Sequence, residues 1–375
     1  MSEIKHLNFD DYLIRARQLI RTRRPELPYL QSNLQEKIIT ANSPYELVPP
    51  LPTMGKKRYR FGVLLIHGLL DSPFSLLDLG ERLARAGIFC RSVLLPGHGT
   101  QPEDLINISF HDWRHIVQYG VNAFKDDVDF LYIAGFSTGA ILAVQQALLE
   151  RKIAGLILLA PAIHLRGPAD WTLKLHRLKK WLGLDRNPWL YHVKETDYVK
   201  YQSIPLNAVI EVQKLIHFIA ELRQTEHLNC PVFLVVSQND ETISSKEAIH
   251  FFSDYDHMLS QLILYSPTPY LSSDKRFIVR CSQYPDLGIK NFSHVCIPFA
   301  PYNPHYGQNG DFEHATKTKN NTTYGAYHRI ERLYDNLMGH LNMVHVQRKT
   351  LTYNPDFEFM SDAIIQFIQQ FPLSV

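Results

Sequence analysis

Five short apolar runs lie in the first two thirds of the sequence, and a helical pattern or a polar loop follows each of them. Runs of this length without polar alternation are typical of strands that are buried on both faces of a sheet. The runs are Phe61–Ile66, Ile88–Leu95, Phe130–Ala134, Gly155–Ala160 and Val232–Ser237. Helical patterns at Ser75–Ala86 and Ala140–Arg151 follow the first and third runs. This alternation predicts an α/β fold with a doubly wound, mostly parallel sheet, in which ligands bind beyond the carboxyl ends of the strands.

The stretch from Ile163 to Asn229 interrupts this alternation and is rich in Trp, Leu and Lys. Two runs within it have apolar residues at helical spacing. These residues are Trp171, Leu175, Leu178 and Leu182 in the first run and Val209, Val212, Ile216 and Ile219 in the second. Such apolar faces must be buried, and the carboxyl edge of the sheet is available to cover them. We therefore predict an inserted helical cap over the site.

The rest of the chain completes a division into six parts. Leu262–Tyr265 and Phe277–Cys281 are further strand candidates, one for the sheet and one for a hairpin. A polar, aromatic stretch predicts a loop-rich insertion with a helix near Tyr327–Leu341, and Phe357–Phe371 predicts a closing amphipathic helix. The predicted parts are an N-terminal extension packed outside (1–60), the first and second parts of the core (61–162 and 230–300), the cap (163–229), the insertion (301–356) and the closing helix (357–375).

The segment GFSTGA, which ends at Ala140, lies between the third strand and its helix. A serine at such a sharp turn is held in a strained conformation with its hydroxyl exposed, and the residues two positions before and after it must be small. Gly135 and Gly139 meet that demand around Ser137. The N–H of Thr138, at the N-terminus of the helix, can donate to a developing oxyanion. We predict that Ser137 is a nucleophile; the alternative is a tight turn whose serine caps the helix.

The segment HGLLDSP follows the first strand and has the position of a second oxyanion loop. Acyl transfer needs a second oxyanion donor, and the backbone N–H of Leu69 is well placed to provide it. His67 is expected to brace this loop by hydrogen bonding, with the role of catalytic base as the alternative. Asp71 and Ser72 are expected to cap the helix that follows.

An acid and a base complete the set of candidate catalytic groups. Asp240, in PVFLVVSQNDETIS, follows a strand and can orient a histidine, although an Asx-turn or a helix cap also explains it. Glu241 is the alternative carboxylate. His294, in GIKNFSHVCIPF, is the predicted base, and His305, in YNPHYG, is its rival. The chain order is then Ser137, Asp240 and His294.

These motifs resemble those of the α/β-hydrolase superfamily, and most of all its lid-bearing carboxylesterases and monoacylglycerol lipases. The motifs are HGLLDSP, LPGHGTQPEDL, GFSTGA, PVFLVVSQNDETIS and SHVCIPF, of which the first four have family order and family-like separations. The resemblance covers Phe61–Ser253 and, by motif only, the region of His294. It implies a nucleophile at Ser137, an acid at Asp240, a base at His294, oxyanion amides at Leu69 and Thr138, and a helical lid between Ala162 and Cys230 that shapes the acyl pocket.

Two features depart from the family pattern. The separation of Asp240 from His294 is longer than usual for this branch, and about 80 residues follow His294 where a single helix normally ends the fold. The segment PYNPHYG after the base either lines the substrate pocket or forms a well-packed turn. The side chains that we expect to line the pocket are His67, Phe136, Trp171 and Tyr302.

Composition and charge narrow the function class. The net charge of +2 gives no electrostatic footprint for nucleic acid. No metal-ligand spacing is visible, and serine acyl transfer needs no cofactor. The N-terminus has no secretory h-region, no apolar stretch approaches the ~20 residues of a membrane span, and four sparse cysteines form no CxxC pair. We therefore expect a cytoplasmic protein without a stable membrane anchor.

The predicted activity is that of a serine hydrolase of carboxylic esters whose acyl group is lipophilic. The apolar cap motivates the lipophilic substrate, and its 10 Lys and Arg against 7 Asp and Glu leave a contact with a membrane surface open. A thioesterase or an acyltransferase on the same fold is the first alternative. A non-catalytic, hydrolase-like binding protein is the second. Oligomeric state has no signal in the sequence.

Overall fold

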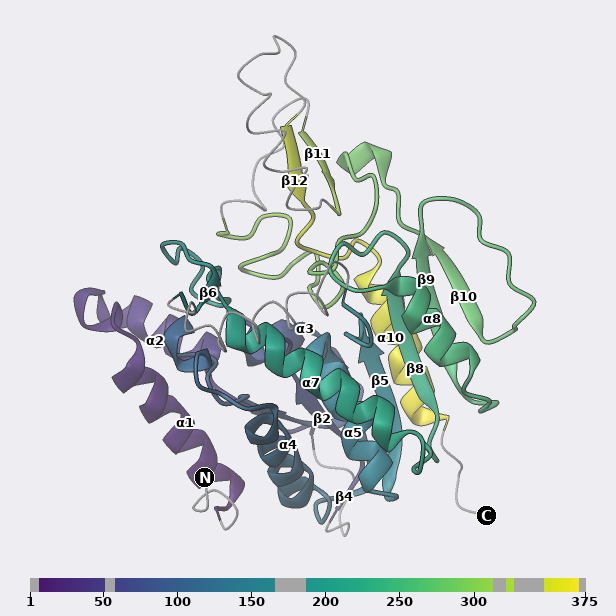
Figure 1. The fold of residues 1–375 in the computed structure, drawn as a ribbon, viewed down its shortest axis with the longest axis horizontal. Coiled ribbons are helices and arrows are strands. Elements are labelled where there is room, and N and C mark those ends of the chain that lie inside the picture. The colour runs from purple at the N-terminus through teal and green to yellow at the C-terminus, as the bar shows by residue number, and fades with distance from the viewer. Residues whose placement is uncertain (1–6, 51–57, 166–186, 313–321, 327–346, 371–375) are drawn as a thin grey trace, which may run out of the picture. The chain divides into compact units, whose positions relative to one another are not determined.

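The structure is a computed structural model that describes residues 7–50, 58–165, 187–312, 322–326 and 347–370 (Figure 1). The chain divides into two compact units: Met1–Leu156 with Gly167–Cys230, and Ile157–Arg166 with Pro231–Val375. One eight-stranded sheet has the strand order β1-β3-β2-β4-β5-β8-β9-β10. Strand β5 (Ile153–Leu159) contributes residues to both units. The predicted α/β fold with a mostly parallel sheet is confirmed.

The first unit contains the strands around the predicted nucleophile. Its sheet strands are β1 (Glu46–Leu47), β2 (Tyr59–Ile66), β3 (Phe89–Val93) and β4 (Val128–Phe136). Strand β2 pairs in parallel with β3 and with β4, and its last six residues are buried. Strand β1 pairs antiparallel with β3 at the edge of the sheet. The N-terminal extension therefore adds a strand to the sheet, which a two-residue element could not reveal by periodicity.

Six α-helices lie in the described part of the first unit. They are α1 (Phe9–Arg23), α2 (Ser32–Asn42), α3 (Leu77–Arg85), α4 (Phe110–Phe124), α5 (Thr138–Leu149) and α7 (Leu206–Leu222). Short 3₁₀ turns lie at Leu27–Tyr29, Pro73–Leu76 and Pro102–Leu105. Helix α5 is buried along nearly its whole length, and α4 and α7 pack beside it (Figure 1). This burial makes α5 a rigid support for the residue that precedes it.

Part of the predicted cap falls within the described chain. Helix α7 contains the second amphipathic run and buries Val212 and Ile219. It packs against α4 and α5, in the helical layer of the first unit. The short strands β6 (Trp189–Tyr191) and β7 (Ile204–Pro205) precede it as an antiparallel pair. The first amphipathic run, which includes Trp171, lies outside the described residues, so the cap as a unit stays a prediction.

The second unit carries the other half of the sheet. Strands β8 (Val232–Ser237), β9 (Gln261–Ser266) and β10 (Phe277–Cys281) pair in parallel, with α8 (Ser245–Ser253) between β8 and β9. Both strand candidates are confirmed, and the hairpin predicted for one of them is wrong, because β9 and β10 pair in parallel within the sheet. A parallel partner normally needs a long crossover, whereas residues 267–276 return the chain without a helix. That short connection resembles a hairpin in the sequence.

The C-terminal part completes the second unit. The closing helix α10 (Phe357–Gln369) begins where the sequence predicts, and its Phe367 ring packs on Phe233 of β8. A 3₁₀ turn (Pro285–Leu287) lies before the insertion, and the insertion contains a parallel pair of short strands, β11 (Thr322–Gly325) and β12 (Gln347–Thr350). The helix predicted at Tyr327–Leu341 lies outside the described residues. Among the described helices, none is long and apolar enough to cross a membrane.

Candidate active site

Ser137 occupies a strained turn between β4 and α5. Its backbone has φ 54° and ψ −112°, a region that side-chain-bearing residues rarely adopt. A Cβ on Gly135 would lie 2.3 Å from the carbonyl carbon of Gly139, and a Cβ on Gly139 would lie 2.1 Å from the carbonyl oxygen of Ile66. Both glycines are therefore sterically required. The strained strand-to-helix turn that the sequence predicts is confirmed.

The segment after β2 lies directly against this turn. A Cβ on Gly68 would approach the Cβ of Ser137 to 3.3 Å and the ring of Phe136 to 3.2 Å. Leu69 follows Gly68, and Thr138 is the first residue of α5, where an N–H has no acceptor within its own helix. No hydrogen bond between described residues engages the N–H of Leu69 or of Thr138. These two amides are the candidate oxyanion donors.

His67 braces the segment that carries Leu69. Its Nδ1 lies 2.8 Å from the Gly68 carbonyl oxygen, and its Nε2 accepts a hydrogen bond from the Leu95 N–H at 3.0 Å. Burial, together with the neighbouring His98, holds the pKa of His67 well below its usual value, so the ring is neutral. Both ring nitrogens are engaged by backbone groups. His67 therefore braces this loop by hydrogen bonding, and neither of its ring nitrogens is available to act as a base.

The other predicted residues of this loop behave differently from expectation. Ser72 does not cap the following 3₁₀ turn through its side chain; its hydroxyl donates to the carbonyl oxygen of Ala41. The carboxylate of Asp71 accepts a hydrogen bond from the Ser72 N–H at 2.9 Å. The capping prediction for Ser72 is thus wrong, because its hydroxyl accepts no hydrogen bond from the N–H groups of the turn.

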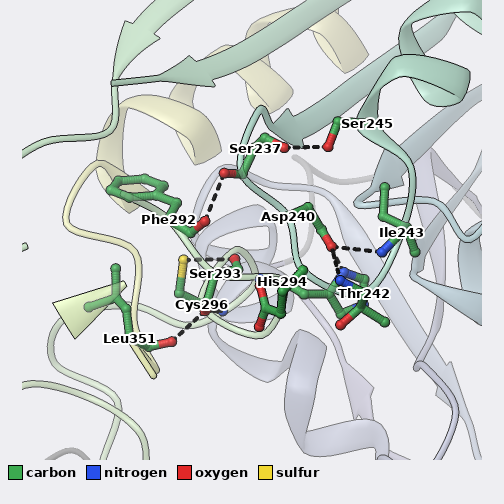
Figure 2. Close-up of polar contacts among 11 residues, drawn as sticks. Ser237, Asp240, Thr242, Ile243, Ser245, Phe292, Ser293, His294, Cys296 and Leu351 are labelled. Atoms are coloured by element: carbon green, nitrogen blue, oxygen red, sulfur yellow. Dashed lines mark hydrogen bonds and ion pairs between the residues drawn. The ribbon is translucent and has the colours of Figure 1, made fainter. Parts of the chain in front are cut away.

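In the second unit, Asp240 and His294 form a hydrogen-bonded pair (Figure 2). Oδ2 of Asp240 lies 2.7 Å from Nδ1 of His294, and Oδ1 accepts the N–H groups of Thr242 and Ile243, each at 2.8 Å. Asp240 has no exposed surface. Its carboxylate therefore forms the expected Asx-type turn and orients the histidine at the same time. With the Nδ1 proton directed at Asp240, Nε2 is the basic nitrogen of the ring.

Glu241 has a separate role beside this pair. One of its carboxylate oxygens, Oε2, accepts a hydrogen bond from the backbone N–H of His294 at 2.8 Å. Burial and the adjacent charge of Asp240 raise the pKa of Glu241 to about 7. Asp240 thus contacts the imidazole ring of His294, whereas Glu241 holds the main chain of the loop that carries His294. Sequence reasoning considered Glu241 only as a substitute acid.

Two serine hydroxyl groups form hydrogen bonds that hold the loop of His294 in place (Figure 2). Ser237, at the end of β8, donates to the carbonyl oxygen of Phe292 at 2.8 Å, and Ser293 donates to that of Leu351 at 2.5 Å. Leu351 follows strand β12, so the last part of the insertion returns to support the loop of His294. The extra residues after His294 therefore include a structural support for the predicted base.

His305, the rival base, belongs to a different pair. Its Nδ1 contacts the carboxylate of Asp311, and its N–H donates to Asn303 Oδ1 at 2.9 Å. A Cβ on Gly310 would lie 2.1 Å from the His305 carbonyl oxygen, so the turn is closely packed. Of the two histidines, His294 contacts Asp240. The segment PYNPHYG is likewise closely packed, since a Cβ on its Gly307 would lie 2.4 Å from the Asn303 carbonyl oxygen, and its contact with a substrate pocket stays a prediction.

The side chains predicted to line the substrate pocket differ in their exposure. Phe136 is 1% exposed and packs beside Gly68, whereas Tyr302 is 54% exposed and meets the ring of Phe357 edge-on. Trp171 lies outside the described residues. His67 is 1% exposed and is held by its loop. Ser137, Leu69 and Thr138 thus lie in the first unit, and Asp240 and His294 lie in the second.

A strand that turns through a strained serine into a buried helix, on a mostly parallel α/β sheet, defines an α/β-hydrolase. The chain belongs to the hydrolase family described as serine aminopeptidase, S33, whose family model matches residues 58–267. The matched residues include Asp240 and the two glycines that flank Ser137, whereas His294 lies beyond the match.

Two named relatives place the chain in the branch that is similar to monoacylglycerol lipases. It is 29% identical over 187 residues to a thermostable monoacylglycerol lipase of Bacillus sp. (strain H-257), which covers 48% of this chain and 71% of the relative. It is 24% identical over 209 residues to a carboxylesterase of Bacillus subtilis (strain 168), which covers 54% and 81%.

Two solved structures share the fold. One, from a study of the metagenome-derived lipolytic enzymes LipS and LipT, has a TM-score of 0.50 and 22% identity over 60% of this chain and 87% of its own. The other, DcsB with a substrate analogue, has a TM-score of 0.50 and 11% identity over 88% and 94%. At these identities the likeness concerns the fold alone, which for DcsB includes much of the chain beyond residue 267.

Proposed function

We propose that the protein is a serine hydrolase that cleaves carboxylic esters with a lipophilic acyl group, through Ser137, Asp240 and His294. The observation that carries the proposal is the strained backbone of Ser137 between two glycines that cannot be replaced without a clash. Proteins retain such strain where the surroundings enforce it and the function needs it. The pairing of Asp240 with His294 at 2.7 Å adds a histidine whose Nε2 is suited to accept a proton.

In the proposed reaction, Ser137 Oγ attacks the ester carbonyl carbon while His294 Nε2 takes the hydroxyl proton. The N–H groups of Leu69 and Thr138 stabilise the resulting oxyanion. The imidazolium, stabilised by Asp240, gives its proton to the departing alkoxide as the C–O bond of the ester breaks. A water that loses a proton to His294 then attacks the acyl-enzyme and releases the carboxylic acid. The proposed chemistry needs no metal ion and no organic cofactor.

The substrate class rests on two supports. The relatives of this chain are named as a monoacylglycerol lipase and a carboxylesterase, and the predicted cap, whose described helix is α7, is rich in apolar side chains. We therefore expect lipophilic acyl chains, with Phe136 and Tyr302 in contact with the substrate. A cytoplasmic location and a transient contact with a membrane surface stay predictions. Thioester hydrolysis and acyl transfer use the same residues and are the second candidate function.

A panel of substrates tests the proposal. Purified wild type is assayed against 4-nitrophenyl esters and matched acyl thioesters of graded chain length, with glycerol as an added acceptor. Turnover of the esters, with kcat/KM rising with acyl length and lost in Ser137→Ala, supports the proposal. Rates confined to thioesters, or acyl transfer to glycerol in place of hydrolysis, would select the second candidate. An inactive wild type that binds the acyl chains would indicate a hydrolase-like binding protein.

A further inference from the structure

Leu70, the residue after the predicted oxyanion donor Leu69, has a left-handed backbone with φ 64°. A residue with a branched side chain rarely adopts this conformation unless its surroundings hold it there. Both polar backbone groups of Leu70 are held. Its N–H donates to Nε2 of His98 at 3.0 Å, and its carbonyl oxygen accepts the N–H of Tyr201 at 2.7 Å. The conformation of Leu70 therefore depends on two residues that are remote in sequence.

His98 is built to accept this hydrogen bond. It lies in the segment LPGHG after β3 and is 1% exposed. Its Nδ1 lies 3.2 Å from the Leu95 carbonyl oxygen and 3.3 Å from that of Pro96, so Nδ1 carries the ring proton and Nε2 is the acceptor. Burial lowers the pKa of His98 to about 4, which keeps the ring neutral near pH 7. A single tautomer thus presents a lone pair to Leu70.

Tyr201 joins the same two loops from a third segment. Its hydroxyl accepts the N–H of Thr100 at 2.7 Å and donates to the carbonyl oxygen of Gly97 at 3.3 Å. Its ring stacks on the ring of His98, with 6.3 Å between centroids and 8° between planes. Its own N–H donates to Leu70. The side chain of Tyr201 therefore fixes the LPGHG loop, and its main chain fixes the loop of Leu69.

The peptide group between Leu69 and Leu70 connects this network to the chemistry. The N–H that His98 accepts belongs to that peptide, so its orientation constrains the ψ angle of Leu69. The Leu69 N–H lies in the preceding peptide and is positioned through the backbone of Leu69, whose carboxyl side is held in this way. A misplaced oxyanion donor loses most of its effect, because such donors act only within hydrogen-bond distance of the developing charge. Gly68 already places this loop against Ser137.

We propose that His98 and Tyr201 are positioning residues of the oxyanion hole, which hold Leu70 in its left-handed conformation and thereby place the Leu69 N–H. The inference rests on the proposed function, and it adds two residues that no motif of nucleophile, acid or base includes. It also gives the LPGHG segment a role: its histidine serves the neighbouring loop and does not contact the substrate.

A matched pair of variants separates the acceptor from the bulk of the ring. In His98→Gln, a side-chain carbonyl oxygen can occupy the place of Nε2, so the acceptor for Leu70 is kept. In His98→Asn, the shorter amide can keep the donor toward Leu95 and Pro96 but has no acceptor for Leu70. Tyr201→Phe keeps the ring and the main-chain contact but removes both hydroxyl hydrogen bonds. The readouts are kcat, KM, the Ki of a trifluoromethyl ketone that mimics the tetrahedral intermediate, and Tm.

We expect His98→Asn to lower kcat by about 30- to 100-fold, with KM changed less than about twofold, since loss of one oxyanion donor costs on the order of 10²–10³ in kcat. The Ki of the ketone should rise by the factor by which kcat/KM falls. His98→Gln should stay within about fivefold of wild type, and Tyr201→Phe should fall between the two.

Three results would overturn the inference while the proposed function stands. These are a folded His98→Asn with wild-type kcat, equal losses in the Asn and Gln variants, and a loss of kcat with an unchanged Ki. A failure of His98→Asn to fold leaves the test to Tyr201→Phe, whose kcat and Ki must then change together. A wild type that neither turns over esters nor binds the ketone would overturn the proposed function, and this inference with it.

Discussion

Replacement of Asp240 by Asn tests the proposed catalytic acid with little change in the shape of the side chain. Oδ1 of Asp240 accepts two backbone N–H groups at 2.8 Å, and an Asn carbonyl oxygen can accept both of them. The Asn amide then directs an N–H at Nδ1 of His294, which lies 2.7 Å from Oδ2 in the native pair. Since two donors cannot face each other, the ring must move its proton to Nε2, and it can no longer accept the proton of Ser137.

The expected cost is large and confined to catalysis. Loss of the correct tautomer in a serine–histidine–aspartate arrangement lowers kcat by about 10⁴, which corresponds to about 5.5 kcal/mol at 25 °C. The assay is steady-state hydrolysis of a 4-nitrophenyl ester, with Glu241→Gln as the control that changes the adjacent carboxylate. Thermal unfolding should show Asp240→Asn folded, because both backbone hydrogen bonds are kept. A folded variant with kcat within tenfold of wild type would refute the reasoning.

Three further changes test other parts of the account. The pKa of Glu241 is raised from 4.5 to about 7, so the stability that this group contributes is complete below about pH 4.5 and is lost as the pH rises through 7. Glu241→Gln should therefore be more stable than wild type by up to about 3 kcal/mol at pH 8 in urea unfolding, with no gain at pH 4.5; an equal gain at both pH values contradicts this. Gly139→Ala places a Cβ 2.1 Å from a carbonyl oxygen and should lower the free energy of unfolding by more than about 3 kcal/mol. A decrease below about 1 kcal/mol would show that the turn at Ser137 can relax. His305→Ala should keep kcat within about fivefold of wild type, because His305 pairs with Asp311, whereas His294→Ala should lose more than about 10³-fold; the opposite order would make His305 the base.

The sheet could be predicted where burial alone sets the pattern. Val232–Ser237 is apolar up to its final serine and forms β8 with the same ends, since a strand covered on both faces needs no alternation. Phe277–Cys281 was harder, because this edge strand is only partly buried and its short connection resembles that of a hairpin. Strand β1 has two residues and gains its identity only from pairing with β3. Local periodicity does not predict which segments, distant in the sequence, pair with each other.

The candidate site likewise has some features that could be predicted from the sequence and others that could not. Gly135 and Gly139 could be read from the sequence because a sharp turn around a serine excludes side chains at both positions. Asp240 could be placed near a histidine, but which of two adjacent carboxylates meets the ring depends on the turn that Thr242 and Ile243 form. The hydrogen bonds of His98 and Tyr201 to Leu70 join segments remote in sequence, and no local pattern encodes them.

The central claim is that Ser137 carries the acyl group. A fluorophosphonate reacts with an activated serine to leave a stable adduct, and peptide mapping by mass spectrometry locates it. The account predicts one phosphonyl group per chain, on the peptide that contains Ser137, with loss of ester hydrolysis in proportion to labelling. An adduct on another residue, or full ester hydrolysis by an enzyme that is phosphonylated at Ser137, would contradict it.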